Sequence, residues 1–446
     1  MNIDYILNNT QGYTNMMEKR FKDPSAIIEL EELRKIYVNK LIEKEQLSKA
    51  HNNCSKLISR IKKAGKVEGD DDDALTEMFT FSSSEFDHND TDLVISLIKN
   101  RIKKIQDEKE RYEKLVLDDL EKLKVKVSEI PNLLDSSVPI SQSEDDNKVV
   151  FQTSSSLETK SLGQFKLCED LEIYESATKI AGNRGYFLVG DGVRLNAALQ
   201  SYALDFITRR GYKVMSTPFF MNRDAMKLVC QLSEFDETLY TVRDSGECDK
   251  YLIATSEQPL TAYFDGKKIN DLPVKLSGIS SCFRKEAGKH GVDTNGIFRV
   301  HQFEKVEQFC VTDACSSYEM MEEMLQNAKD FYESLGISYR VVSIVSGALN
   351  NAASKKYDIE GWFPGSNQFR ELVSCSNTTD YFSRRLNCKN KKGELVHMLN
   401  STLYANTRTI CCILETHQTE SGVKIPDVLV PYMMGKDFIP FKNIEK

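Results

Sequence analysis

Two long stretches in the first third of the chain have apolar residues spaced three and four positions apart and contain neither proline nor glycine. This spacing predicts two amphipathic helices, from Ile27 to Lys63 and from about Asp92 to Glu129. Gly65, Gly69 and the acidic run from Asp70 to Asp73 interrupt the pattern between them. We therefore expect an antiparallel helical hairpin with helices each about 50 Å long, at about 1.5 Å per residue. The apolar positions are Leu30, Leu33, Tyr37, Leu41, Cys54, Leu57 and Ile61 in the first helix and Tyr112, Val116, Leu120, Leu123 and Val127 in the second.

Farther along the chain, short apolar runs alternate with single helical patterns. A helix from Leu195 to Arg210 is closed by Gly211, and a strand from Val214 to Phe220 follows. Pro218 cannot donate a hydrogen bond inside a sheet, so this strand should lie at an edge or an interface. Strands joined by hairpins and occasional helices favour an α+β domain on a mainly antiparallel sheet. The other expected elements are strands at 251–259, 339–346, 368–376 and 396–402 and helices at 313–335 and 404–416.

A polar, irregular segment separates these two patterns. It runs from Pro131 to about Glu158 and includes a serine-rich and acidic stretch from Ser141 to Asn147. The chain is therefore expected to have a helical N-terminal domain at residues 1–130, a linker at 131–158 and an α+β domain at 159–446.

The stretch from Ser281 to Gln308 is expected to form two antiparallel strands joined by a loop. Arg284 and Glu286 close the first apolar run, and the segment from Gly288 to Gly296 is rich in turn-forming residues. Such a strand face, with an arginine, an aromatic ring and a carboxylate, is a poor core face. It suits the floor of a site for a phosphorylated ligand that carries an aromatic ring. Alternation along the second strand places on this face Arg299, His301, Phe303, Lys305 and Glu307.

Composition narrows the possible classes of protein. The 446 residues are 40% hydrophobic and 28% charged, as in a soluble globular protein, and the net charge is −8 at pH 7. Eleven cysteines with no C-x-x-C pair argue against a disulfide framework or zinc cluster and fit a reducing compartment. No apolar run reaches membrane-spanning length, and the opening residues resemble neither a signal nor a transit peptide. We expect a cytoplasmic protein with no membrane partner.

No P-loop or G-x-G-x-x-G motif is present, so any nucleotide phosphates must be held by other groups.

Basic residues gather near the expected tip of the helical hairpin. Between Gln46 and Lys63 there is no carboxylate. A basic tip on an acidic protein could contact a nucleic-acid backbone, but long exposed helices often carry many lysines, and the residues alone favour this second interpretation. The candidate residues are Lys49, Lys56, Arg60, Lys62, Lys63, Arg101, Lys103 and Lys104.

Several strings in the chain resemble the seryl-tRNA synthetases, a family of class II aminoacyl-tRNA synthetases. The hairpin matches motif 2 in the form FRxE followed by FRVHQFxKVEQ, the helix and strand at 195–220 resemble motif 1, and NSTLYANTRT resembles motif 3. RFKDP, TSEQP and FRELVSCSN resemble the eukaryotic cytosolic branch. The resemblance covers nearly the whole chain, although the segment at 161–164 lacks a histidine that is common there. It implies a homodimeric enzyme that activates serine with ATP and Mg²⁺ and transfers it to serine tRNA, and that grips the tRNA variable arm with its helical hairpin. Serine–tRNA ligases commonly also charge selenocysteine tRNA.

The resemblance also implies roles for individual residues. Arg284 and Arg408 would be catalytic, neutralising charge on the α- and terminal phosphates, while Phe303 and Arg408 would hold adenine between them. ATP would be bound by Arg284, Lys285, Glu286, Val300, Phe303, Glu371, Leu372, Val373, Ser374 and Arg408. Serine would be bound by Thr255, Ser256, Glu257, Arg284, Glu307, Asn400 and Thr402. Glu371 and Ser374 would hold Mg²⁺; their odd spacing on one strand requires a bend or a bulge for both to face the ligand.

Two alternatives remain open from the sequence. A related enzyme could adenylate an amino acid for an acceptor other than tRNA, although the intact helical arm argues against this. A non-catalytic coiled-coil scaffold would be expected to lose Arg284, Glu286, Glu371 or Arg408, and all four are present.

Overall fold

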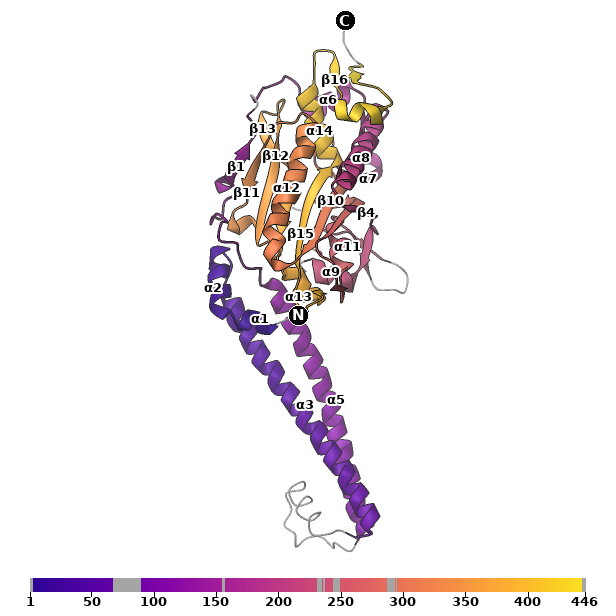
Figure 1. Cartoon of the computed structure of the whole chain (residues 1–446). Helices are drawn as coiled ribbons and strands as arrows, with labels where there is room; N and C mark the ends of the chain where they lie inside the picture. The colour runs from indigo at the N-terminus through magenta and orange to yellow at the C-terminus, as the bar shows by residue number, and fades with distance from the viewer. Residues whose placement is uncertain are drawn as a thin grey trace. The chain divides into compact units, whose positions relative to one another are not determined.

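The computed structural model describes residues 3–66, 90–154, 157–230, 235, 237–243, 249–286, 293 and 295–442 (Figure 1). The chain forms two compact units. One is Ser25–Glu129, and the other combines Met1–Pro24 with Ile130–Lys446. The sequence-based division placed residues 1–24 with the helical domain, whereas here they belong with the larger unit. Arg20 shows why, because it is buried and its guanidinium donates to backbone carbonyls of that unit.

The smaller unit is the expected pair of long helices. Helix α3 spans Ser25–Ala64 and helix α5 spans Thr91–Glu129, within two residues of the predicted bounds. Ion pairs join Glu29 with Lys126 at 2.6 Å and Lys44 with Glu113 at 3.3 Å. From Glu29 to Lys44 along α3, the paired residue moves back along α5 from Lys126 to Glu113. The two helices are therefore antiparallel. The connection expected between them lies largely at 67–89, outside the described residues.

The seam between the two helices is apolar in its distal half and contains one buried charge pair. Cys54, Leu57 and Ile61 are buried against α5, as their spacing predicted. Nearer the middle, Asp119 is buried and accepts a hydrogen bond from Lys40 at 2.6 Å. A buried carboxylate is costly without its partner, so this pair favours one register of the two helices over a shifted one.

The larger unit is built on a mainly antiparallel sheet of eight strands, as expected. Among the described residues, the one parallel pair in this sheet is β4 with β9. Strand β4 ends before Pro218 and lies at an edge, which agrees with the expectation for this proline-containing segment. The opposite edge is β1, which takes five residues from the segment expected to be a linker. In spatial order the strands are β1 (Lys148–Gln152), β11 (Tyr339–Ser343), β12 (Lys355–Phe363), β13 (Gln368–Asn377), β15 (His397–Ala405), β10 (Gln302–Thr312), β9 (Val274–Phe283) and β4 (Lys213–Ser216).

Short elements surround this sheet. The remaining helices of the larger unit are α1 (Ile3–Leu7), α2 (Thr10–Lys19), α6 (Gln164–Asp170), α7 (Thr178–Ala181), α8 (Asp191–Arg209), α9 (Arg223–Val229), α11 (Glu257–Ala262), α12 (Ser317–Ser334), α13 (Tyr381–Leu386) and α14 (Asn406–His417), with 3-10 turns at 144–146, 314–316, 346–348 and 427–433. The small strands are β2 (Tyr174–Ser176), β3 (Tyr186–Leu188), β5 (Phe220–Asn222), β6 (Thr241–Val242), β7 (Lys250–Leu252), β8 (Lys268–Ile269), β14 (Lys389–Asn390), β16 (Gly422–Lys424) and β17 (Phe438–Pro440). No helix in the described part of the chain is long and apolar enough to cross a membrane.

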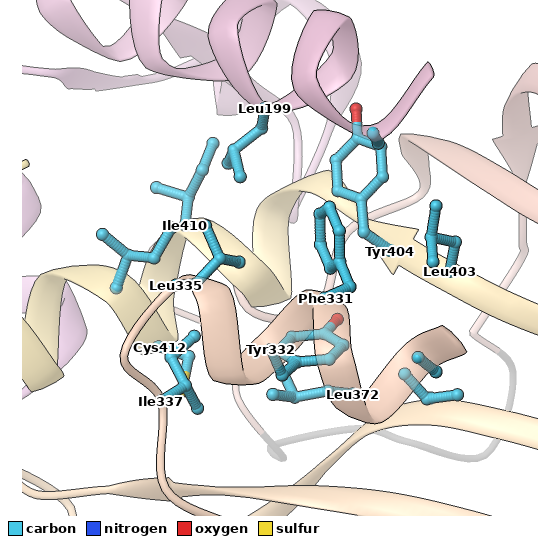
Figure 2. Packing of buried hydrophobic residues seen from close by; sticks show 14 of the residues in the cluster. Leu199, Phe331, Tyr332, Leu335, Ile337, Leu372, Leu403, Tyr404, Ile410 and Cys412 are labelled. Carbon is cyan, nitrogen blue, oxygen red and sulfur yellow. The ribbon is translucent and has the colours of Figure 1, made fainter. Parts of the chain in front are cut away.

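Helices α8, α12 and α14 bury a large apolar core against one face of the sheet (Figure 1). Figure 2 shows part of it, with Phe331 and Tyr332 of α12 close to Tyr404 of β15. Side chains of β10 alternate between the two faces: Val306 enters this core, whereas Phe309 enters a second apolar cluster. The sheet is therefore covered on both faces. Lys305 and Glu307, which share a face of β10 with Phe309, line a cavity.

Candidate functional site

A cavity of about 330 Å³ lies over the centre of the sheet, where β9, β10, β13 and β15 run side by side. The structure brings most of the predicted site residues to its wall. Their assigned roles remain predictions, but their common location is a property of the fold. The predicted residues that line it are Thr255, Glu257, Arg284, Glu286, Val300, Phe303, Glu307, Glu371, Leu372, Ser374, Asn400, Thr402 and Arg408.

Three predicted residues are not among the described residues lining this cavity. Ser256 is fully buried, and its hydroxyl donates to the Gly278 carbonyl at 3.3 Å. Val373 packs into the helix-covered core. Lys285 follows the end of β9, and its backbone N–H donates to the Thr238 carbonyl at 2.9 Å. The side chains of Ser256 and Val373 are thus committed to packing, which leaves only their backbone groups for a ligand.

The predicted hairpin is present as β9 and β10, with Phe283 opposite Gln302. Because β10 begins at Gln302, the expected common face holds for Phe303, Lys305 and Glu307 but not for His301. His301 instead lines a neighbouring cavity of about 500 Å³, and its Nδ1 is 2.9 Å from the Arg284 carbonyl. Most of the predicted mobile loop at 288–296 lies outside the described residues.

The two predicted catalytic arginines each lie over an aromatic ring. The guanidinium carbon of Arg284 is 5.1 Å from the centre of the Phe303 ring, and that of Arg408 is 5.1 Å from the centre of the Phe298 ring. Phe298 was not predicted as a partner of Arg408, whereas the expectation that adenine lies between Phe303 and Arg408 stays a prediction. Both arrangements hold a permanent positive charge beside an aromatic face, which suits a ligand with phosphates and a flat base.

Glu286 sits between two arginines in a constrained backbone. Its carboxylate Oε2 is 2.8 Å from Arg299 and 3.7 Å from Arg184. Its φ angle is +53°, a conformation that costs energy for a residue with a side chain. A strained backbone conformation persists only where contacts with the surrounding structure hold it in place. Here the contacts with the two arginines hold the Glu286 carboxylate at the wall of the cavity.

Glu371 and Ser374 do converge, and the reason is an irregularity of β13. Pairing with β12 runs from Val373 opposite Ile359 directly to Glu371 opposite Glu360. Leu372 is left unpaired, so the strand shifts by one residue, and Glu371 and Ser374 reach the same cavity despite their odd spacing. The bend or bulge required by the sequence is therefore present.

The donors at this bulge fit a magnesium ion that also keeps phosphate oxygens and water. Glu371 supplies a carboxylate and Ser374 a hydroxyl, and no group of three or more His, Cys, Asp or Glu side chains suited to a metal occurs among the described residues. Desolvation opposes the charged form of Glu371, but the positive charges of Arg408, Lys356 and Arg284 prevail and lower its pKa. The lowered pKa favours the ionised carboxylate, whose Oε2 is ion-paired with Arg408 at 3.3 Å.

Sequence reasoning missed several residues of the cavity wall. Lys356 is ion-paired with Asp358 at 3.0 Å, and Lys305 with Glu307 at 2.5 Å. Lys356 could have been found from strand pairing, because it lies directly opposite Ser376, another lining residue. Arg299 and Lys305, which were expected on the hairpin face but given no role, also line the cavity. The lining residues that were not predicted are Phe298, Asn350, Lys356, Ser376, Ala405 and Thr407.

The basic residues of the helical unit are all at its surface. Each of the eight candidates on α3 and α5 is exposed, as a contact with a phosphate backbone would require. Exposure alone does not distinguish such a contact from a solvated lysine-rich helix.

Comparison with known proteins shows which family this chain belongs to. Residues 240–417 match the family model described as tRNA synthetase class II core domain (G, H, P, S and T), and residues 1–94 match the Seryl-tRNA synthetase N-terminal domain. The chain is 55% identical over 335 residues to the cytoplasmic serine–tRNA ligase of Dictyostelium discoideum, covering 72% of this chain and 73% of that protein.

Two solved structures are similar over almost their whole length. The cytoplasmic serine–tRNA ligase of Naegleria fowleri in complex with AMP is 42% identical, with a TM-score of 0.81 and 99% of each chain covered. The seryl-tRNA synthetase of Pyrococcus horikoshii complexed with ATP is 32% identical, also with a TM-score of 0.81, and covers 99% of this chain and 100% of that one.

Proposed function

The chain belongs to the seryl-tRNA synthetases of class II, and on that premise we propose that its central cavity activates serine with ATP and passes it to serine tRNA. The enzyme is a cytoplasmic serine–tRNA ligase, as its curated relatives are named. The observation that carries the site assignment is the convergence on one cavity of Arg284 after β9, Glu371 in β13 and Arg408 in α14, from three separate parts of the chain.

The cavity residues can perform the first step without a protein nucleophile. The serine carboxylate attacks the α-phosphorus of ATP in line, an oxygen–phosphorus bond forms, and pyrophosphate leaves. Arg284 and Arg408 hold fixed positive charge where negative charge accumulates, and they cannot lose a proton at physiological pH. The adenine ring is bounded by Phe303 and the strained Glu286. Catalysis then rests on positioning and electrostatics.

The serine end of the cavity is lined by groups that match the small hydroxylated substrate. Glu307 and Thr402 are both buried and 3.4 Å apart, and Asn400 lies on the same strand as Thr402. Alanine would leave these buried polar groups unpaired, which discriminates strongly, whereas the extra methyl group of threonine is worth only about 1–3 kcal/mol. Rejection of threonine therefore depends on the size of this pocket.

Glu371 and Ser374 would hold a magnesium ion that neutralises charge on the triphosphate when bound. The second step transfers the activated serine to the terminal ribose of the tRNA, whose hydroxyl attacks the seryl carbonyl and releases AMP. For the tRNA itself, the exposed lysines and arginines near the described ends of α3 and α5 provide a phosphate-binding surface. The long helical unit also argues against an acceptor other than tRNA.

A second copy of this chain is the proposed partner of the face formed by α7, β3, the start of α8 and β5. This face carries large apolar side chains in solvent, with Ile180 78% exposed and Phe220 51% exposed, and it adjoins the unpaired edge strand β4. Exposed apolar patches next to an open edge mark association sites. Sedimentation velocity should give the mass of a homodimer, and replacing Phe187 and Val193 by glutamate should shift it toward the monomer. A wild-type monomer at micromolar concentration would exclude the homodimer.

The function is tested by separating its two steps. Serine-dependent exchange of pyrophosphate into ATP should occur, alanine should not support it, and threonine should support it about 10- to 200-fold less efficiently than serine. Replacing Lys56, Lys62 and Lys63 by glutamate should leave this exchange unchanged but lower kcat/KM for charging serine tRNA by about 10-fold or more, because each neutralised phosphate contact is lost. The measurements are exchange and aminoacylation at the same salt concentration.

A matched control carries the same change in net charge elsewhere on the helical unit. Replacing Lys35, Lys114 and Lys124 by glutamate should leave charging within about twofold of wild type. Equal loss in both triple variants would show that net charge, not the proposed surface, governs tRNA binding. Exchange without charging in the wild-type enzyme would favour an acceptor other than tRNA, and no exchange with any amino acid would favour the scaffold.

A further inference from the structure

Two neighbouring charged side chains of β10 form a buried ion pair in the floor of the cavity. The Lys305 ammonium is 2.5 Å from Glu307 Oε2, and the side chains are 7% and 1% exposed. Both residues line the cavity. A buried charge is costly without a partner, so each of these groups depends on the other.

The two oxygens of the Glu307 carboxylate are used differently. Oε2 accepts from Lys305 at 2.5 Å and from the Thr402 hydroxyl at 3.4 Å. Oε1 is buried and has no hydrogen-bond partner among the described residues. A buried carboxylate oxygen without a donor costs free energy unless a ligand supplies one. Glu307 thus lines the cavity while one of its buried oxygens has no donor among the described residues.

The strands around the pair fix its geometry. Lys305 and Glu307 are two residues apart, so they share a face of β10. Their cross-strand neighbours on β9 are small, Ser280 opposite Lys305 and Gly278 opposite Glu307. Ser256 and Leu260 pack so closely against Gly278 that a larger residue there would clash with them. On the other side, a shift in the pairing of β10 with β15 skips one residue and places Thr402 opposite Glu307.

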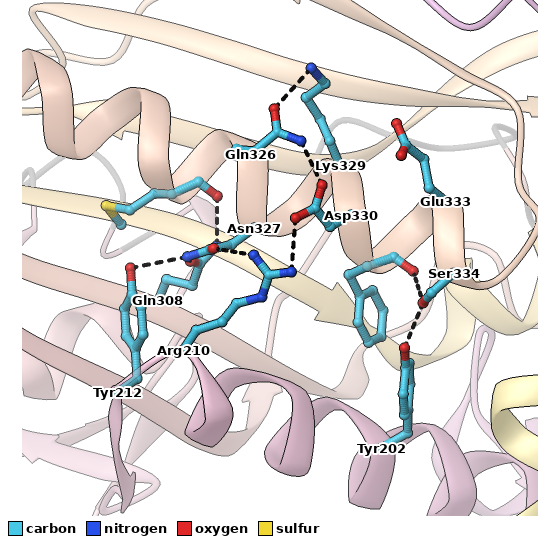
Figure 3. Close-up of polar contacts among 12 residues, drawn as sticks. Tyr202, Arg210, Tyr212, Gln308, Gln326, Asn327, Lys329, Asp330, Glu333 and Ser334 are labelled. Atoms are coloured by element: carbon cyan, nitrogen blue, oxygen red, sulfur yellow. Dashed lines mark hydrogen bonds and ion pairs between the residues drawn. The ribbon is translucent and has the colours of Figure 1, made fainter.

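On the opposite face of β10, hydrogen bonds fix the strand next to Glu307. Gln308, next to Glu307, donates to the Met324 carbonyl at 3.0 Å and accepts from Asn327 at 2.9 Å. Asn327 in turn accepts from Arg210 at 2.7 Å (Figure 3). This network ties the strand to α12 and α8, so the backbone at Glu307 has little freedom to follow a change in its side chain.

We propose that Lys305 is a positioning residue for the amino-acid substrate. Its ammonium compensates the buried Glu307 charge and holds Oε2, which leaves Oε1 as the acceptor for the ammonium or hydroxyl group of serine. This inference rests on the proposed function of the cavity. It assigns to Lys305 an effect on serine binding that passes through Glu307, and no contact with ATP.

A double-mutant cycle tests this assignment, with the Michaelis constants for serine and ATP measured by pyrophosphate exchange. Lys305→Met should raise KM for serine by about 10-fold or more, in keeping with the loss of a charged hydrogen bond, and leave KM for ATP within about twofold. Lys305→Arg, which keeps the charge, should recover part of the loss. Adding Lys305→Met to Glu307→Gln should cause little further loss, because the lysine would then have no carboxylate to hold.

Lys356→Met is the matched control, since this lysine lines the same cavity but is paired with Asp358. It should affect KM for ATP more than KM for serine. Thermal unfolding of each variant, followed by circular dichroism, separates a local effect from loss of the fold.

Two results would overturn the inference. Equal losses from Lys305→Met in the wild-type and Glu307→Gln backgrounds would mean that Lys305 contacts the substrate itself. An unchanged KM for serine in a folded Lys305→Met enzyme would mean that the ion pair does not matter for binding. Failure of the proposed function is distinguishable from both, because it would appear as no serine-dependent exchange in the wild-type enzyme.

Discussion

Arg284→Lys should lower the rate of serine-dependent pyrophosphate exchange by about 10²–10³-fold, the range measured when one preorganised donor to a transition state is removed. Arg284 lies at the end of β9, over the Phe303 ring, and borders both the predicted phosphate and serine positions. Lysine keeps the positive charge but loses the planar fork that can hold two oxygens at once and stack on an aromatic face. The reduction should appear in kcat as well as in kcat/KM, because the charge on the α-phosphate grows in the transition state.

Arg340→Lys is the matched control for this substitution. Like Arg284, Arg340 lies over an aromatic ring, that of Phe369, but it is on β11, pairs with Glu360 and does not line the cavity. Exchange in this variant should remain within about twofold of wild type. If Arg284→Lys retained nearly full exchange, the α-phosphate would have to be neutralised by another residue, and the assigned catalytic role would be withdrawn.

Arg20→Met should lower the free energy of unfolding of the larger unit by about 3–5 kcal/mol, the usual cost of breaking a buried charged contact. Arg20 is 2% exposed and donates to the carbonyls of Asn350, Asn132 and Ala353. Methionine fills similar volume but leaves all three buried acceptors without a donor. Because Asn350 also lines the cavity, exchange activity should fall along with stability.

Urea denaturation followed by tryptophan fluorescence reports on this unit, since the single tryptophan, Trp362, lies on β12. Lys19→Met, at the end of α2, is the control and should change the unfolding free energy by less than about 0.5 kcal/mol. A midpoint for Arg20→Met equal to that of wild type would show that residues 1–24 are not needed to stabilise the catalytic unit.

The two helices of the helical unit were predictable almost to the residue, because a helix is specified by residues that are close together in the sequence. Apolar spacing and the absence of proline and glycine set α3 and α5 to within two residues. The attachment of residues 1–24 to the larger unit was not predictable. Arg20 contacts backbone carbonyls 112, 330 and 333 positions away, and a backbone carbonyl has no signature in the sequence.

Site residues could be predicted where they lie on a strand, because successive side chains of a strand point to opposite faces of the sheet. Phe303 and Glu307 were placed correctly, and the odd spacing of Glu371 and Ser374 indicated the irregularity later found in β13. Lys305 was placed on the same face but was given no role, because a lysine two residues from a glutamate is usually a solvated surface pair. Only the burial of both side chains shows otherwise.

The order of strands in the sheet has a consequence for the synthesis of this enzyme on the ribosome. Strand β15 lies between β13 and β10, yet it is the last of the eight strands to be translated. Until it emerges, the nascent chain holds two half-sheets whose inner edges are unpaired, and Arg408 follows only after it. Such edges invite wrong pairing, so the growing chain should be most vulnerable to aggregation just before completion and should need chaperone protection there. An incomplete chain released before β15 would have neither a continuous sheet nor a nucleotide site.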